Sequence, residues 1–240
     1  MNLASKRWGI ELIGSQVDLE AWRAMLKPPF DPFINEVEDE RGEYLTLRSS
    51  AFDGIATSKE VHRAAKELFS ILNVAMSMNS DCDPVTDGAV VEFVASGRPR
   101  KHHFLQAEPG SYRLRGGIAE MTLSDAHGNA IEPSPAPSKA QSWMRAAALN
   151  PEIGHALRYL EGKPSWFDLY KAYEAVKRMP NGSIPKREIE RFAQTANAGI
   201  RHHPSNKNQP HKRPMELWEA RMLIARWVAA AIDDFLTKSP

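Results

Sequence analysis

A basic segment between residues 200 and 214 carries the side chains of this chain that are best suited to chemistry. Its sequence is IRHHPSNKNQPHKRP, without an acidic residue. Four fixed cations can bind phosphate oxygens, and three imidazoles can take up or release protons near neutral pH. We therefore predict Arg201, His202, His203 and His211 as catalytic residues, and Lys207, Lys212 and Arg213 as contacts to nucleic acid. The simpler interpretation is a solvated loop between two helices whose cations keep it soluble.

A second basic cluster precedes a predicted strand near residue 104. It comprises Arg98, Arg100, Lys101, His102 and His103, with Arg113 and Arg115 on the strand that follows. The neighbouring Phe104 and Tyr112 could stack on bases, as aromatic residues do in single-strand binders. We predict Arg98, Arg100 and Lys101 as nucleic-acid contacts. An Arg-Pro-Arg-Lys sequence is more often only a charged hairpin turn.

Several other kinds of site are excluded by the sequence. It contains no phosphate-loop motif, no dinucleotide-binding glycine motif and no Gly-x-Ser-x-Gly, so we expect no cofactor. The single Cys82 excludes an internal disulfide and any zinc site with several cysteines. His202 and His203 are adjacent and cannot both point the same way from a regular element. No acid nearby completes a site with His211, so we expect no metal.

Composition is ordinary, but charge is divided unevenly along the chain. Hydrophobic residues make up 42% and charged residues 25% of the 240 residues, which is typical of a soluble globular protein. The first residues lack the apolar core of a signal peptide, and no apolar run reaches the ~20 residues of a membrane span, so we expect a cytoplasmic protein. Residues 1–131 hold 14 Lys and Arg against 19 Asp and Glu, a net charge of −5. Residues 132–240 hold 17 against 11, a net charge of +6.

The first half is expected to form an α+β domain over residues 1–131, with a small antiparallel sheet and two helices. Alternating apolar residues predict strands at 8–13, 33–37, 44–47, 89–94, 104–107 and 112–123. Two helices are expected between these strands, the first capped by Asp18 and the second by Ser58. The Pro- and Ser-rich residues 132–138 are interpreted as a linker between two domains.

Residues 139–240 are expected to form an all-α helical bundle of five helices. Ser138, Pro151 and Ser165 mark the beginnings of three of them. The last helix, from Pro214 to about Leu236, has two neighbouring apolar stripes. The first stripe consists of Trp218, Met222, Ala225, Ala229, Ile232 and Leu236, and the second of Ile224, Val228, Ala231 and Phe235. Two such stripes predict a central helix that is buried on both faces.

This second half resembles the HEPN superfamily, the small helical-bundle domains of bacterial toxin and phage-defence proteins. The resemblance rests on the bundle and on Arg201-His202-His203 near the start of its last helix. Many members are dimeric, metal-independent ribonucleases that use an Arg and a His with four to six residues between them. The corresponding positions after Arg201 hold Asn206, Lys207 and Asn208. This spacing does not match the family motif, and only a rearranged pair, such as Arg201 with His211 across the loop, could take its place.

Three functions follow from these patterns. The leading hypothesis is a binding or interaction protein whose basic loop contacts an anionic partner such as RNA. The second is a HEPN-like ribonuclease in which Arg201 stabilises the charge of the transition state and a histidine transfers protons. The third is a structural homodimer that pairs through the apolar final helix. No membrane partner is expected.

Overall fold

The computed structural model describes residues 7–40, 42–80, 82–94, 98–104, 135–179, 184–197 and 211–238. Backbone contacts divide the chain into two compact units. The first comprises residues 1–69 and 79–141, and the second residues 70–78 and 142–240. This division falls between Gln141 and Ser142, close to the predicted linker, and it assigns part of helix α2 (Ser58–Ser80) to the second unit.

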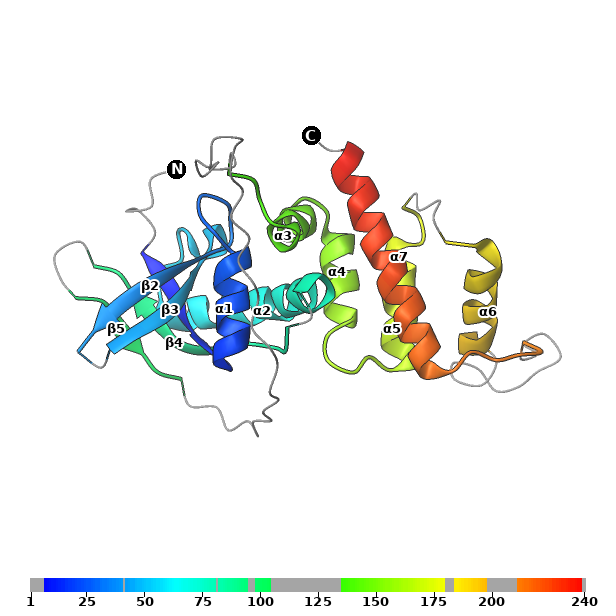
Figure 1. The fold of residues 1–240 in the computed structure, drawn as a ribbon, viewed down its shortest axis with the longest axis horizontal. Coiled ribbons are helices and arrows are strands. Elements are labelled where there is room, and N and C mark those ends of the chain that lie inside the picture. The colour runs from blue at the N-terminus through cyan, green and yellow to red at the C-terminus, as the bar shows by residue number, and fades with distance from the viewer. Residues whose placement is uncertain are drawn as a thin grey trace, which may run out of the picture. The chain divides into compact units, whose positions relative to one another are not determined.

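The first unit contains an antiparallel sheet of five described strands (Figure 1). Their spatial order is β2 (Phe33–Asp39), β3 (Gly42–Arg48), β1 (Trp8–Ile13), β4 (Thr86–Glu92) and β5 (Arg100–His102). The first three strands in chain order agree with the alternation of apolar residues in the sequence. With the helices, the sheet confirms the α+β class. Its central strand β1 is largely buried, and Ile10 is fully inaccessible to solvent.

Helix α1 (Gln16–Met25) begins after Ser15, whose hydroxyl accepts a hydrogen bond from the Asp18 amide at 3.2 Å. The prediction that Asp18 caps this helix is therefore wrong. Asp18 lies in the first turn, where its carboxylate accepts the Asp83 N–H at 2.9 Å. Deeper in the helix, Trp22 stacks on Phe69 of α2, with 5.8 Å between the ring centroids. This aromatic pair joins the two helices of the first unit.

Three further predicted boundaries in the first half differ from the structure. Helix α2 is capped by Thr57 rather than Ser58, because the Thr57 hydroxyl accepts the Glu60 N–H at 3.3 Å. The fourth strand begins earlier than predicted, at Thr86, and the fifth ends at His102, before the expected segment 104–107. A short 3-10 helix at Ser50–Phe52 was not predicted. The expected strand at 112–123 lies outside the described residues.

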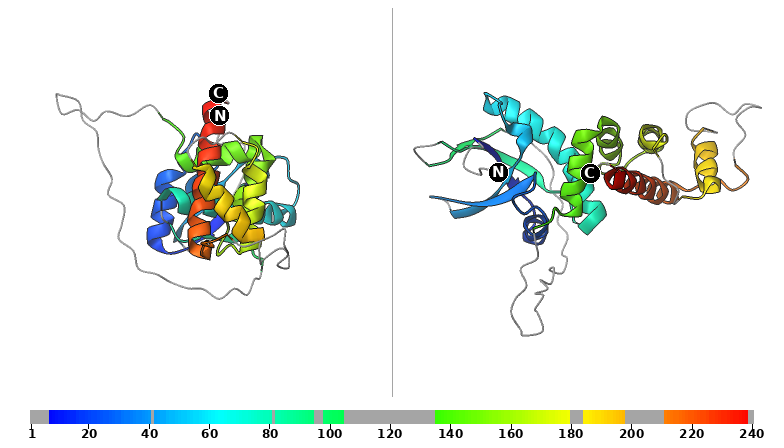
Figure 2. Two further views of the ribbon diagram at one scale, coloured as in Figure 1. Left: turned by 90° about the vertical axis from the view of Figure 1, so that its right-hand side faces the viewer. Right: turned by 90° about the horizontal axis from the view of Figure 1, so that it is seen from above.

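The second half of the chain contains five helices among its described residues (Figures 1 and 2). They are α3 (Lys139–Leu149), α4 (Pro151–Tyr159), α5 (Trp166–Val176), α6 (Lys186–Ala196) and α7 (Leu217–Lys238). Ser165 and Asp168 form a reciprocal capping box at the start of α5, which confirms the predicted cap. Pro151 occupies the first turn of α4, where its missing N–H costs nothing.

Helix α7 buries a different face from the one that its first apolar stripe predicts. Trp218 and Met222 are 62% and 59% exposed, whereas Leu223, Ile224 and Trp227 are buried. The Trp227 ring packs edge-on against Tyr173 of α5, with 5.1 Å between centroids. In the second stripe Ile224, Val228 and Ala231 are buried, whereas the first stripe is buried only at Ile232, so the helix is not buried on both faces. Among the described helices, none is both long and apolar enough to cross a lipid bilayer.

Candidate functional site

The described end of the basic segment leads directly into α7. His211 Nδ1 accepts the Arg213 N–H at 3.0 Å, which gives a tight local turn. The side chains of Lys212 and Arg213 are exposed. Arg201, His202, His203 and Lys207 lie outside the described residues. The structure therefore places His211, Lys212 and Arg213 in the turn before α7, and the predicted pairing of Arg201 with His211 remains a prediction.

Arg191 of α6 fixes the backbone at this point. Its Nε donates to the Arg213 carbonyl oxygen at 2.9 Å, and its Nη2 donates to the Pro214 carbonyl oxygen at 3.0 Å. The same Nη2 lies 2.9 Å from Oε2 of Glu219 in α7. The Glu216 backbone N–H and the Arg191 side chain both donate to Glu219 and lower the pKa of its carboxyl. The guanidinium thus holds the chain that presents Lys212 and Arg213.

In the second basic cluster, two of the three predicted contact residues form ion pairs within the protein. Arg98 pairs with Glu40, although both side chains are largely exposed. Lys101 Nζ lies 2.9 Å from Glu11 Oε1 and 3.1 Å from Asp39 Oδ2, and it sits over the Tyr44 ring at 3.4 Å from the centroid. Burial opposes the charged form of Lys101, but the two carboxylates outweigh it and raise its pKa.

Lys101 is therefore a mostly buried cation, with only 15% of its side chain exposed. Arg100 lies opposite Glu92 in the pairing of β5 with β4, and its side chain is exposed. Phe104, which was expected to stack on bases, stacks on the His62 ring, with 4.3 Å between centroids. The predicted strand with Tyr112, Arg113 and Arg115 lies outside the described residues. Of this cluster, Arg98, Arg100 and His103 present exposed side chains.

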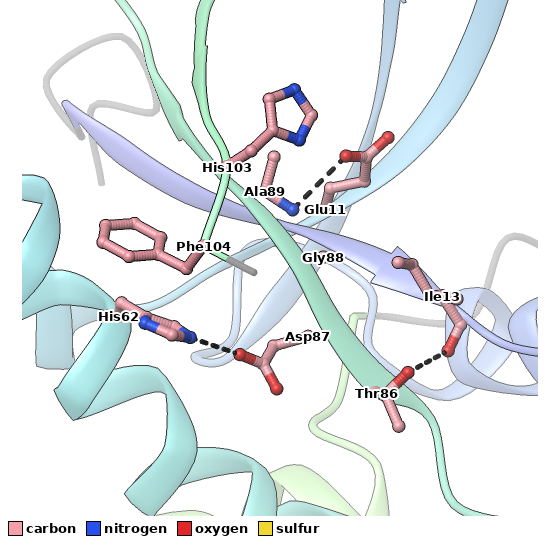
Figure 3. Close-up of a pocket in the computed structure, with 9 residues that line it drawn as sticks. All are labelled: Glu11, Ile13, His62, Thr86, Asp87, Gly88, Ala89, His103 and Phe104. Carbon is pink, nitrogen blue, oxygen red and sulfur yellow. Dashed lines mark hydrogen bonds and ion pairs between the residues drawn. The ribbon is translucent and has the colours of Figure 1, made fainter. Parts of the chain in front are cut away.

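A pocket that the sequence did not reveal lies in the first unit, on the β1–β4 pair (Figure 3). Its volume is about 400 Å³, within the range of small-ligand sites. Glu11 and Ile13 come from β1, and Thr86, Asp87, Gly88 and Ala89 from β4. His62 of α2 and His103–Phe104, which follow β5, complete the lining. The pocket therefore combines four titratable side chains with an aromatic ring.

His62 and Asp87 form the most enclosed polar pair of this pocket. His62 Nε2 lies 3.0 Å from Asp87 Oδ2, and the two side chains are only 13% and 16% exposed. A carboxylate that holds an imidazole in one orientation is the arrangement from which histidine acts as an acid or base. Sequence reasoning missed the pair because 25 residues separate its members. It exists only because α2 and β4 meet in the fold.

A β-bulge shapes the floor of the pocket. Ile10 pairs with Val90 and Leu12 with Asp87, so two steps along β1 match three along β4. The extra residue lies at Gly88–Ala89, opposite Glu11, whose Oε2 accepts the Ala89 N–H at 3.4 Å. A Cβ at Gly88 would lie 3.0 Å from the Ile13 side chain and 3.1 Å from the Glu11 carbonyl oxygen. Bulges commonly re-aim side chains next to functional sites.

Within the described ranges, no three His, Cys, Asp or Glu side chains are arranged to hold a metal ion. The protein was also compared with known proteins. No family model matches the chain, and no curated protein or solved structure is significantly similar to it. Function must therefore be inferred from the residues themselves.

Proposed function

We propose that this protein is a binding protein whose basic segment, residues 200–213, contacts the phosphate backbone of a nucleic acid, with RNA as the partner. The observation that carries the proposal is the anchored end of this segment. Arg191 holds the carbonyl groups of Arg213 and Pro214, so Lys212 and Arg213 project from a fixed stretch of backbone. Prepositioned cations lose less conformational freedom on binding than cations on an unrestrained chain.

The charge distribution supports the same function. The segment contains four cations and no acid, within a half that carries a net charge of +6. The proposal includes the HEPN-like, all-α bundle for this half. The aromatic contacts of Phe192 in α6 with Trp166 and Tyr173 in α5 support that arrangement. Ribonuclease activity is the second candidate function, on the resemblance alone, and the same experiment tests it.

The test is binding of a fluorescently labelled single-stranded RNA, measured by anisotropy at several salt concentrations in EDTA. We expect affinity to fall steeply with salt, because each phosphate contact adds about 0.7 to the slope of log K against log salt for a single strand. Replacement of Arg201, Lys207, Lys212 and Arg213 by Ala should weaken binding at least tenfold and flatten this slope.

The matched control removes four exposed cations elsewhere in the second half, Lys163, Lys177, Arg178 and Arg187. This variant has the same net charge, so equal losses of affinity in the two variants would contradict a specific role for the basic segment. Intact RNA after the titration means binding without cleavage. Cleavage that is lost in Arg201→Ala would instead identify the ribonuclease.

A further inference from the structure

We propose that the His62–Asp87 pocket of the first unit binds a small organic cation, an ammonium or guanidinium group carried on a short apolar body. This site is separate from the basic segment and would take a ligand of opposite charge. The reasons are the charge of the pocket, its available hydrogen-bond acceptor, its apolar wall and the bulge that shapes it.

The charged groups around the pocket favour a cation. The carboxylates of Asp87 and Glu11 both line it. Lys101 forms ion pairs with both Glu11 and Asp39, so this group of three keeps a net charge of −1. Asp87 adds a second negative charge, beside the imidazole rings of His62 and His103 in the lining. An anionic ligand would have to approach two carboxylates.

Asp87 supplies the hydrogen-bond acceptor. One of its oxygens is bound to His62 Nε2. Figure 3 shows its other oxygen turned away from His62, and among the described residues this oxygen accepts no side-chain hydrogen bond. His62 thus holds the Asp87 carboxylate in one orientation, as a supporting residue does for a side chain that contacts a ligand. The second carboxylate oxygen stays available to the ligand. A charged donor on the ligand would form the stronger, charge-assisted type of hydrogen bond.

The apolar side of the pocket suits a short hydrocarbon or aromatic body. Ile13 is 54% exposed although it ends a mostly buried strand. Phe104 is held in place by its stack on His62. Because Gly88 has no side chain, Ile13 can lie close to the floor of the pocket, which Asp87 and Glu11 also line. Pockets for small ligands combine such apolar surface with a few fixed polar groups.

The test is a titration of the ¹⁵N-labelled full-length protein with benzamidine, followed by the amide signals of Gly88 and Ala89. We expect saturable shifts of these two signals. Benzoate, which has the same ring but the opposite charge, should produce none. Shifts that do not saturate, or equal binding of benzoate, would overturn the proposal.

The decisive variant is Asp87→Asn, which keeps the size of the side chain and its hydrogen-bonding capacity toward His62 but removes the charge. It should weaken benzamidine binding at least tenfold, the usual scale for a hydrogen bond to a charged group. Glu38→Gln removes an exposed carboxylate of β2, outside the pocket, and should bind as the original protein does. Unchanged binding in Asp87→Asn would overturn the proposal. If that variant does not give a folded spectrum, Glu11→Gln removes the other carboxylate of the pocket and should also weaken benzamidine binding.

The natural cation could be a free amine or the side chain of a partner protein. N-acetyl-arginine methylamide presents a guanidinium on an arginine side chain, with both backbone ends blocked. Tighter binding of this compound than of butylamine supports an arginine of a partner protein as the ligand. The reverse order supports a free amine. Failure of both, and of benzamidine, would overturn the site, and neither result affects RNA binding by the basic segment.

Discussion

Arg7 Nη2 lies 2.6 Å from Oε1 of Glu92, and this pair ties the beginning of β1 to the end of β4. Glu92 is 9% exposed as a residue and also lies 3.3 Å from His102 Nε2 of β5. The hydrogen bond from Arg7, with that from His102, keeps the pKa of the Glu92 carboxyl below its ordinary value near 4.5, although burial opposes this. One carboxylate therefore connects three parts of the sheet.

This pair should make stability depend on pH. A carboxyl with a lowered folded pKa stabilises the folded state above its unfolded pKa, and this contribution is lost as pH falls through the folded pKa. We expect Glu92→Gln to cost about 1 kcal/mol at pH 7, a figure discounted because Arg7 is 54% exposed. The cost should shrink below about pH 4. Urea unfolding at pH 7 and pH 3 measures it. A cost that is equal at both pH values would contradict the expectation.

Gln141 should contribute strongly to the stability of the first unit. Its Nε2 lies within 3.0 Å of the carbonyl oxygens of Lys27, Phe30 and Pro32, and the residue is only 2% exposed. Replacement by Leu would leave these carbonyl groups without their donor, at an expected cost of about 3 kcal/mol. Chemical unfolding checks this, with the exposed Gln194→Leu as control. Equal stability of the two variants would show that water replaces the amide.

The start of α2 offers a pair of adjacent hydroxyls with different expected effects. Thr57 Oγ1 accepts the Glu60 N–H and donates to the Glu60 carboxylate at 2.8 Å, whereas Ser58 is already within the helix. We expect Thr57→Ala to lower the free energy of unfolding by about 1 kcal/mol. Ser58→Ala should change it by less than about 0.5 kcal/mol. Thermal unfolding of the two variants distinguishes them, and a larger loss in Ser58→Ala would restore Ser58 as the cap.

The two apolar faces of α7 should respond differently to substitution. Leu223 is 2% exposed, and Leu223→Ala should cost about 2–5 kcal/mol through the cavity that it leaves. The double variant Trp218→Ser and Met222→Ser changes exposed side chains and should cost less than about 1 kcal/mol.

Sedimentation of the double variant also tests the homodimer hypothesis. A dimer of the original protein that dissociates in this variant would show that the exposed stripe pairs two copies.

The positions of most helices and strands follow from the local sequence. Alternating apolar residues located β1, β2 and β3, and the Ser165 cap and Pro151 located the helices that follow them. These signals are local, because side-chain period and capping depend on residues only a few positions apart. The uneven charge and the acid-free basic segment can likewise be read directly from residue order.

Tertiary structure decided which groups meet. The sequence permitted two stripes on α7, and only packing against α5 selected the face with Leu223 and Trp227 for burial. Lys101 was predicted as an external contact, but the sheet places it between Glu11 and Asp39. His62 showed no motif, since its partner Asp87 is brought to it by the meeting of a helix and a bulged strand. Such pairings join residues far apart in the chain, and no local pattern of residues encodes them.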